Sequence, residues 1–276
     1  MKAFIVERYR QDGLRAAELP EPRPGPDDVL VRVRAAGVNP LDAKIRDGDF
    51  KLILRYRPPF VLGHDVAGVV TRVGSAVRKF KVGDEVYARP RDHRIGTFAE
   101  LIAIDQGDVA LKPASLSMVE AAAVPLAGLT AWQALVERAN VTAGQKVLVH
   151  AGSGGVGTIA IQLAKQLGAT VATTTSTSNV EWVKGLGADL VIDYKHEDFA
   201  EVLSGYDVVL DPLGGENLAK SSTVLKPGGL VIGIAGPPDP AFARQIGAPV
   251  FLRAAMTLLS HRVRRQAKRL GVRYSE

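Results

Sequence analysis

One segment, residues 146–157 (KVLVHAGSGGVG), constrains the fold of this chain more than any other. An apolar run ends in a glycine-rich loop, and the loop leads directly into a helical pattern over residues 156–167. The spacing G-x-G-x-x-G is weak evidence alone, but between a strand and a helix it is typical of dinucleotide binding. A tight turn without a ligand is the alternative. The segment therefore favours a βαβ unit with a dinucleotide at its loop.

The parts of this loop predict different roles. Gly152 is suited to the tight turn, Gly154 lets the backbone approach a pyrophosphate, and Gly157 lets the helix lie close to the strand. The helix N-terminus adds free N–H groups and a partial positive charge. We therefore expect cofactor contacts from the whole loop, namely Gly152, Ser153, Gly154, Gly155, Val156 and Gly157.

Composition limits the class of protein. The 276 residues are enough for two domains, and the absence of cysteine excludes disulfides, a thiol nucleophile and cysteine-ligated metal sites. Charged residues come too early for a signal peptide, and no apolar run is long enough to cross a membrane. We therefore expect a soluble, cytoplasmic protein with no membrane contact.

The formal net charge of +6 arises in residues 251–276, where seven Lys and Arg residues face one acid. Such a cluster can bind nucleic acid or phosphate, or it can be the solvated face of an amphipathic helix. Apolar residues recur near helical spacing in this segment, at Leu252, Met256, Leu259, Val263 and Leu270. This spacing favours the second reading, so we predict a basic helical segment and no nucleic-acid partner.

Residues 1–114 are β-rich. Short apolar or alternating runs recur between turn signals such as Asp47-Gly48 and Pro58-Pro59. Runs of this kind predict strands joined by turns, and hence a small antiparallel barrel or sandwich. The expected strands are residues 3–8, 29–38, 66–73, 85–88, 98–104 and 109–112.

The pattern changes after residue 114. Ser117 and Glu120 have the spacing of a helix capping box, and another helical stretch covers residues 130–139. Apolar strands then alternate with helices, which predicts a parallel sheet covered on both faces. The expected strands are 146–150, 170–174, 190–193, 207–210 and 230–234, and the expected helices are 156–167, 180–186, 199–203 and 217–225. We therefore expect an α/β protein, with a β-rich domain at 1–114 and a doubly wound nucleotide domain at 115–250.

The strand after the glycine loop bears on the choice of dinucleotide. An NAD site usually has an acidic residue about twenty residues past the glycines, which binds the ribose 2′-hydroxyl. Here no acid lies between Ala151 and Glu181, and the strand runs into TTTSTSN at 173–179. These hydroxyls can donate to a 2′-phosphate that no carboxylate repels, although they can also form a turn and a helix cap. The absence of an acidic residue in this stretch favours NADPH over NADH.

Further motifs extend from the first domain to the second: AGVNPLD at 36–42, GHDVAG at 63–68, VGDEVY at 82–87, AGLTA at 127–131, LGAD at 186–189 and KPGG at 226–229. With the glycine loop, they make residues 1–250 resemble the zinc-free quinone reductase and alkenal/enone reductase branch of the medium-chain dehydrogenase/reductase superfamily. The resemblance implies a GroES-like first domain, a Rossmann second domain and a homodimer. It also implies a C-terminal return to the first domain, whereas this chain stops at Glu276. We therefore expect either a truncated sequence or a first domain that is completed differently.

The resemblance also predicts that the chain lacks the catalytic zinc. Zinc members of the superfamily bind the metal near the positions of Asn39, His64 and Leu126, where they carry a cysteine, a histidine and a third ligand. Only His64 remains here, because asparagine is a poor zinc ligand and leucine cannot be one. We expect no metal, and a His64 that forms structural hydrogen bonds.

The same resemblance assigns cofactor contacts outside the glycine loop. Thr130 is expected near the nicotinamide ribose and the phosphates. The 2′-phosphate is expected among Thr175, Ser176, Ser178 and Tyr194, and the nicotinamide beside Gly233, Ile234 and Ala235.

Without a metal, alcohol oxidation lacks its electrophile, whereas reduction of a quinone or an α,β-unsaturated carbonyl needs only a donor or cation at the developing enolate. By resemblance, Lys44 is expected to contact the carbonyl oxygen and Asn39 to face the nicotinamide and the substrate. The alternative for Lys44 is a solvated surface lysine. Asp42 and Tyr56 are expected at the substrate, with a helix cap and simple packing as their respective alternatives.

These expectations together predict an enzyme, an NADPH-dependent reductase of a small quinone or enone. An enoyl-thioester reductase is a second candidate, because the same hydride chemistry acts on acyl thioesters. A non-enzymatic cofactor-binding or RNA-binding protein is a third, with the basic residues of 251–276 as its contact surface.

Overall fold

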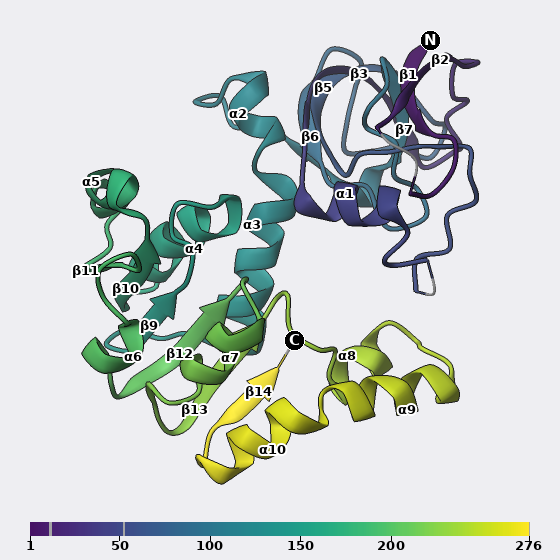
Figure 1. Ribbon diagram of the computed structural model, residues 1–276. Coiled ribbons are helices and arrows are strands. Elements are labelled where there is room, and N and C mark those ends of the chain that lie inside the picture. Colours follow the sequence, from purple (N-terminus) through teal and green to yellow (C-terminus); the bar gives the residue numbers. More distant parts are fainter. Residues whose placement is uncertain (11–12, 52, 276) are drawn as a thin grey trace. The chain divides into compact units, whose positions relative to one another are not determined.

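The computed structural model describes residues 1–10, 13–51 and 53–275, which form two compact units, Met1–Leu126 and Ala127–Glu276 (Figure 1). Helix α2 (Met118–Ala122) begins with the capping box expected at Ser117 and Glu120. Its buried alanines pack against β5 (Asp65–Val73) of the first unit. The boundary expected after residue 114 rested on the end of the strand pattern and the start of the helical one, and the two compact units divide after Leu126.

The first unit is built from antiparallel sheets, as expected of a GroES-like domain. Within the described residues, one sheet has the order β2–β1–β4 and the other the order β7–β3–β5–β6–β8. Apolar side chains that alternate along β3, β5, β6 and β7 form one buried cluster. The remaining strands of this unit are β1 (Lys2–Val6), β2 (Arg15–Glu18), β3 (Asp28–Gly37), β4 (Phe60–Val61), β6 (Glu85–Ala88), β7 (Leu101–Asp105) and β8 (Val109–Leu111), with a short 3₁₀ turn η1 (Gln106–Asp108) before β8.

Helix α1 (Pro40–Asp47) follows β3, and the sequence pattern did not predict it. Asn39 is its N-cap residue, and Pro40 occupies the first helical position, where its missing N–H group is not needed. Gly48 ends the helix with a φ of 81°, in the left-handed region. A helix this short contains too few apolar positions for a periodicity argument.

The second unit contains a parallel sheet with the strand order β11–β10–β9–β12–β13–β14. Counted from β9, this is the order 3-2-1-4-5-6 of a Rossmann fold. The doubly wound sheet expected from the alternation of strands and helices is therefore confirmed. The strands are β9 (Lys146–Val149), β10 (Thr170–Thr175), β11 (Leu190–Asp193), β12 (Tyr206–Asp211), β13 (Leu225–Gly233) and β14 (Arg273–Ser275).

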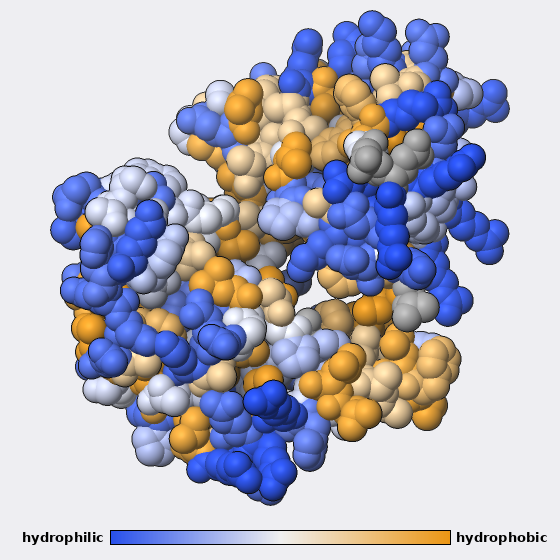
Figure 2. Space-filling model, in the orientation of Figure 1, coloured by the Kyte–Doolittle hydropathy of each residue, from blue (hydrophilic) through white to orange (hydrophobic). Residues whose placement is uncertain are grey.

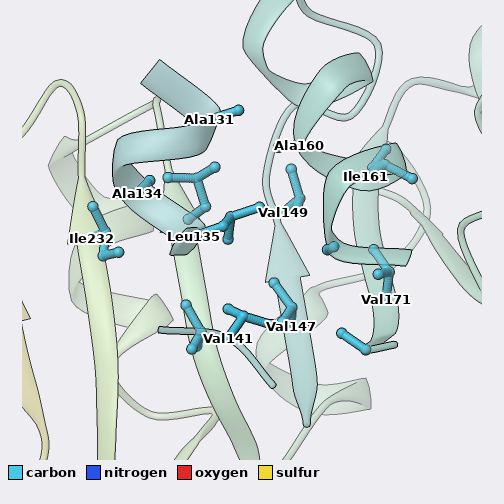
Figure 3. Packing of buried hydrophobic residues seen from close by; sticks show 14 of the residues in the cluster. Ala131, Ala134, Leu135, Val141, Val147, Val149, Ala160, Ile161, Val171 and Ile232 are labelled. Carbon is cyan, nitrogen blue, oxygen red and sulfur yellow. The ribbon is translucent and has the colours of Figure 1, made fainter. Parts of the chain in front are cut away.

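Helices bury both faces of this sheet, and successive residues of β9 show it. Val147 and Val149 belong to a cluster with residues of α3, η2 and α4, and Figure 3 shows them near Leu135. Leu148 packs on the opposite face with residues of α6, α7 and α10. The helical segments up to β13 are α3 (Pro125–Trp132), the π-helix η2 (Gln133–Arg138), α4 (Gly155–Gln166), the 3₁₀ turn η3 (Thr177–Asn179), α5 (Val180–Gly185), α6 (Phe199–Val202) and α7 (Gly215–Ser221).

The C-terminal segment contains separate helices and a strand, where one amphipathic helix was expected. After α8 (Pro240–Gln245), helix α9 (Val250–Leu259) ends at the buried Ser260, and α10 (His261–Arg269) follows. Met256 is buried, whereas Leu259 and Leu270 are exposed, so these residues do not form one continuous apolar face. Strand β14 then pairs in parallel with β13, although its sequence RYS has no apolar run that would predict a strand.

Helices α9 and α10 expose different types of residue. Figure 2 shows apolar residues over α9 and hydrophilic ones over α10. Val250, Phe251 and Leu258 of α9 are exposed, whereas α10 buries Ala267 and presents basic side chains. In the part of the chain that the structure describes, no helix combines the length and the apolar character that a membrane crossing requires.

Candidate functional site

Close packing requires glycine at two positions of the loop between β9 and α4. A Cβ atom on Gly157 would lie 2.2 Å from the carbonyl oxygen of Ala151, so this glycine lets α4 approach the loop as expected. A Cβ atom on Gly152 would lie 2.1 Å from Oγ1 of Thr173 in β10. The left-handed residue of the turn is Ala151, with a φ of 52°, and not Gly152. Gly152 is therefore needed for its approach to β10 rather than for the turn itself.

The other two glycines leave the N-terminus of α4 open. Gly154 is the N-cap residue and Gly155 the first helical residue, and both are exposed. A Cβ atom on Gly155 would meet nothing within 4 Å, and one on Gly154 would meet only the carbonyl oxygen of Ala151, at 3.2 Å. An anion can therefore approach the positive end of the helix.

A cavity of about 660 Å³ lies at the carboxyl ends of the strands next to this loop. It brings together five of the expected cofactor residues, Ser153, Gly154, Thr175, Ser176 and Tyr194. Ser178 lies beside them, with its Oγ 3.4 Å from Oγ of Ser176. The lining also includes residues that the sequence analysis did not single out, among them His150, His196, Glu197, Asp198, Asn217 and Lys220.

The remaining expected cofactor residues lie outside the lining of this cavity. Thr130 belongs to α3, and Gly233 ends β13, with Ile234 and Ala235 directly after it. A Cβ atom on Gly233 would lie 3.2 Å from the ring of Tyr274. Strand β14 therefore places an aromatic side chain beside the position expected for the nicotinamide.

Hydroxyl groups and acids share the edge of the sheet formed by β10 and β11. Thr175 donates a hydrogen bond from Oγ1 to Oγ of Ser153 at 3.0 Å. Its partner in the sheet register is Asp193, whose pKa is lowered chiefly by a hydrogen bond from Thr177. Glu197 follows and lines the cavity. These acids lie at the end of β11 and after it, so the pattern at the end of β10 does not reveal them.

A buried histidine forms the floor of the cavity. His150 is 1% exposed, with Nδ1 3.0 Å from Oγ1 of Thr174 and Nε2 3.0 Å from Oγ of Ser221. Burial lowers the pKa of His150 to about 4, although the nearby carboxylate of Asp211 opposes this shift. The imidazole is therefore neutral at pH 7.

In the first unit, a buried polar cluster joins α1 to the start of β5. Asp42 accepts a hydrogen bond from the N–H group of Asn39 at 2.7 Å, and its other oxygen lies 2.6 Å from Nδ1 of His64. Both Asp42 and His64 are almost completely buried. Asp42 is therefore the helix cap that was given as its alternative. Its side chain is 3% exposed, and its contact with the substrate stays a prediction.

The positions of the superfamily's zinc ligands hold a hydrogen-bond network. Nδ2 of Asn39 donates to Oδ2 of Asp65 at 2.9 Å, and the N–H group of Leu126 donates to Oδ1 at 2.8 Å. His64 uses Nδ1 for Asp42, and its buried Nε2 has no partner among the described residues. No cluster of three His, Cys, Asp or Glu within those residues could hold a metal ion. An amide nitrogen and a leucine do not coordinate zinc, so the donor set does not fit this metal.

Asp65 is the acid at the centre of this network. Burial raises the pKa of Asp65 to about 6, although the hydrogen bonds from Asn39 and Leu126 oppose the shift. The nearby Asp42 raises the pKa further. Asp65 therefore changes its charge in the mildly acidic range, where an ordinary aspartate is fully ionised.

Lys44 and Tyr56 have different surroundings. Lys44 is exposed on α1, so its ammonium can meet solvent or a ligand. The ring of Tyr56 stacks on Phe60 with centroids 5.2 Å apart and lies 5.6 Å from the ring of His93. Burial raises the pKa of Tyr56 to about 12. These contacts match the packing role given as the alternative for Tyr56.

Comparison with known proteins places both units in one family. The model of the alcohol dehydrogenase GroES-like domain matches residues 25–114, and the model of the zinc-binding dehydrogenase matches residues 155–268. The chain is 42% identical over 252 residues to "NADPH-dependent alkenal/one oxidoreductase, chloroplastic" of Arabidopsis thaliana. It is 46% identical over 223 residues to "2-methylene-furan-3-one reductase" of Solanum lycopersicum.

These matches cover 87% and 78% of this chain but only 64% and 56% of the two relatives, so the chain spans less than two thirds of their length. Among solved structures, the quinone oxidoreductase from Coxiella burnetii is 34% identical, with a TM-score of 0.83. That match covers 100% of this chain and 81% of the other. The chain therefore belongs to the medium-chain dehydrogenase/reductase superfamily, in its quinone oxidoreductase and alkenal reductase branch.

Proposed function

We propose that this chain binds NADPH in the cavity beside the glycine loop and reduces a quinone or an α,β-unsaturated carbonyl. The main support for this proposal is the lining of the cavity. Its walls combine the open N-terminus of α4 with the hydroxyl groups of Thr175 and Ser176. The helix terminus suits a pyrophosphate, and the hydroxyl groups suit a 2′-phosphate, to which they can donate hydrogen bonds. The reductases named among the relatives agree with this chemistry.

NADPH, when bound, supplies the hydride, and the residues of the chain hold and orient the reactants. We assign the contact with the carbonyl oxygen to Lys44, because an ammonium group stabilises the enolate that develops as hydride arrives. Asn39 is the residue proposed to face the nicotinamide and the substrate. Asp65 accepts a hydrogen bond from its amide nitrogen and so fixes the orientation of that amide.

Steady-state assays test this proposal. The protein is assayed with NADPH and NADH against a benzoquinone, a short enone and an enoyl-CoA thioester. We expect oxidation of NADPH with the quinone or the enone, and slower oxidation of NADH. Turnover confined to the thioester would replace the proposal with an enoyl-thioester reductase. No oxidation of either cofactor with any acceptor would reject a reductase altogether.

RNA binding has less support. Val263 and Ala267 of α10 pack into the core cluster that contains Leu148, so the basic residues of α10 form the outer face of a helix that packs on the sheet. A salt-dependent affinity for RNA, measured without reductase activity, would favour the non-enzymatic alternative. We also propose a homodimer, which light scattering at several protein concentrations tests.

A further inference from the structure

A continuous chain of buried polar side chains runs beneath the cofactor cavity. Beyond the contacts of His150 with Thr174 and Ser221, Oγ of Ser221 donates to Oδ2 of Asp211 at 3.0 Å. His150, Ser221 and Asp211 are at most 1% exposed, and Thr174 is 4% exposed. The four residues come from the ends of β9, β10 and β12 and from α7, so the chain crosses the carboxyl edge of the sheet. The reaction proposed above leaves these groups without a role.

The acceptors around Ser221 favour one direction for the hydrogens of this polar chain. Oγ1 of Thr174 accepts from the N–H group of Ala151 at 3.2 Å, so its own hydrogen is free to go to Nδ1 of His150. A neutral imidazole then carries its hydrogen on Nε2 and donates to Ser221, whose single hydrogen is shared between Asp211, at 3.0 Å, and the carbonyl oxygen of Asn217, at 2.7 Å. In the opposite direction Ser221 would donate to His150, and neither Oδ2 of Asp211 nor the carbonyl oxygen of Asn217 would receive the Ser221 hydrogen. Burial keeps the imidazole neutral in either direction, so the choice of tautomer rests on the acceptors of Ser221.

The two ends of this chain of polar side chains are hydrogen-bonded to the two loops beside the cavity. At one end, the N–H group of Ala151 belongs to the glycine loop. At the other end, Oδ1 of Asp211 accepts from the N–H groups of Leu213 and Gly214, at 2.8 and 2.9 Å, in the turn between β12 and α7. Ala151 and Leu213 both line the cavity. A shift at either end would therefore change the cavity's width.

We propose that His150 is a positioning residue, which as the Nε2–H imidazole holds the glycine loop and the turn after β12 at a fixed spacing, and so sets the affinity for the cofactor. The inference rests on the proposed function, since it takes the cavity to be the NADPH site. It places the effect on cofactor binding and not on hydride transfer. His150 itself lies beneath the cavity and needs no contact with the reacting atoms.

Three substitutions separate the two ends of the imidazole. His150→Phe keeps an aromatic ring but loses both hydrogen bonds. His150→Gln carries an amide that reaches as far as Nε2, so it can keep the bond to Ser221, whereas His150→Asn reaches only as far as Nδ1. Val149→Ala is the control, because Val149 is a fully buried neighbour on β9 whose side chain is apolar and lies outside the polar chain.

The readouts are the KM for NADPH, kcat, Tm and amide hydrogen exchange. His150→Phe removes the acceptor of the Thr174 hydroxyl and the donor to Ser221, which breaks the hydrogen-bonded link between the two loops. We therefore expect KM for NADPH to rise about tenfold with kcat within about twofold. We expect faster exchange at the amides of Leu213 and Gly214 in the same variant. His150→Gln should stay within about threefold of the unaltered protein, and His150→Asn should resemble His150→Phe. Val149→Ala should lower Tm and leave KM for NADPH unchanged.

Two results would overturn the role of His150: a KM for NADPH in His150→Phe equal to that of the unaltered protein, or unchanged exchange at Leu213 and Gly214. A rise in KM for Val149→Ala equal to that for His150→Phe would also overturn it, because loss of stability alone would then explain the effect. If the unaltered protein does not bind NADPH, the proposed function fails. The exchange measurement, which needs no cofactor, still decides whether His150 couples the two loops.

Discussion

Replacing Gly157 by alanine is expected to destabilise the second unit. The added methyl group would lie 2.2 Å from the carbonyl oxygen of Ala151 and 2.8 Å from the Cα of Gly152. Both obstacles are backbone atoms, so no change of rotamer relieves the contact and α4 must move away from the loop. Overpacking of this kind costs about 1–3 kcal/mol. Because 1 kcal/mol shifts the Tm of a unit of this size by about 2–4 °C, we expect a fall of about 2–12 °C.

Gly155→Ala is the matched control on the same helix. A Cβ atom there would meet nothing within 4 Å, so we expect an unchanged or slightly higher Tm, since alanine restricts the unfolded chain. Thermal unfolding is followed by the fluorescence of Trp132 and Trp182, because the chain has 2 tryptophans and both lie in the second unit. Equal melting temperatures for Gly157→Ala and Gly155→Ala would refute the close approach of α4 to the loop.

Two buried groups and one exposed lysine yield the remaining predictions. The folded pKa of Asp65 is about 6, above its unfolded value, so the first unit should lose up to about 3 kcal/mol as pH rises from about 4 to about 6. The folded pKa of His150 is about 4, below its unfolded value, so the second unit should gain a similar amount as pH rises from about 4 to about 6.5. Urea unfolding at about pH 4 and about pH 6 checks both directions of change. Tryptophan fluorescence reports on the second unit, and amide exchange in β5 reports on the first. A free energy of unfolding that changes in the same direction in both units would contradict the prediction. Lys44→Met should lower kcat/KM for the acceptor by about tenfold or more and leave KM for NADPH unchanged, with Lys79→Met as an exposed-lysine control. A Lys44→Met protein as active as its control would remove Lys44 from the reaction.

The parts of the fold that depend on local signals could be predicted from the sequence. The glycine loop, the capping box at Ser117 and the alternation of apolar strands with helices are each read from neighbouring residues, and together they indicate the Rossmann sheet. Strand β14 shows the limit. Its three residues have no strand pattern of their own and are held by pairing with β13, a partner that only the folded chain supplies.

The candidate site likewise contains residues that the sequence could indicate and residues that only the folded chain brings together. Ser153, Thr175 and Ser176 could be proposed as cofactor contacts, because they lie at or after strand ends that can be recognised in the sequence. His150 and Ser221 could not be paired from the sequence, because they lie 71 positions apart and meet only when β9 and α7 pack together. Asp42 was expected at the substrate, with a helix cap as its alternative, and the structure buries it at the start of a helix too short for its pattern to be recognised.

The affinity of the protein for NADPH relative to NADH, measured by fluorescence titration, tests the assignment of the cavity most directly. We predict that the unaltered protein binds NADPH at least about tenfold more tightly, because hydroxyl groups and not a carboxylate follow β10. Ser176→Asp places a carboxylate there and should reverse the preference, since it repels a 2′-phosphate and can accept a hydrogen bond from a 2′-hydroxyl. An unaltered protein that binds NADH as tightly as NADPH, or a preference that Ser176→Asp leaves unchanged, would contradict an NADPH site at this position.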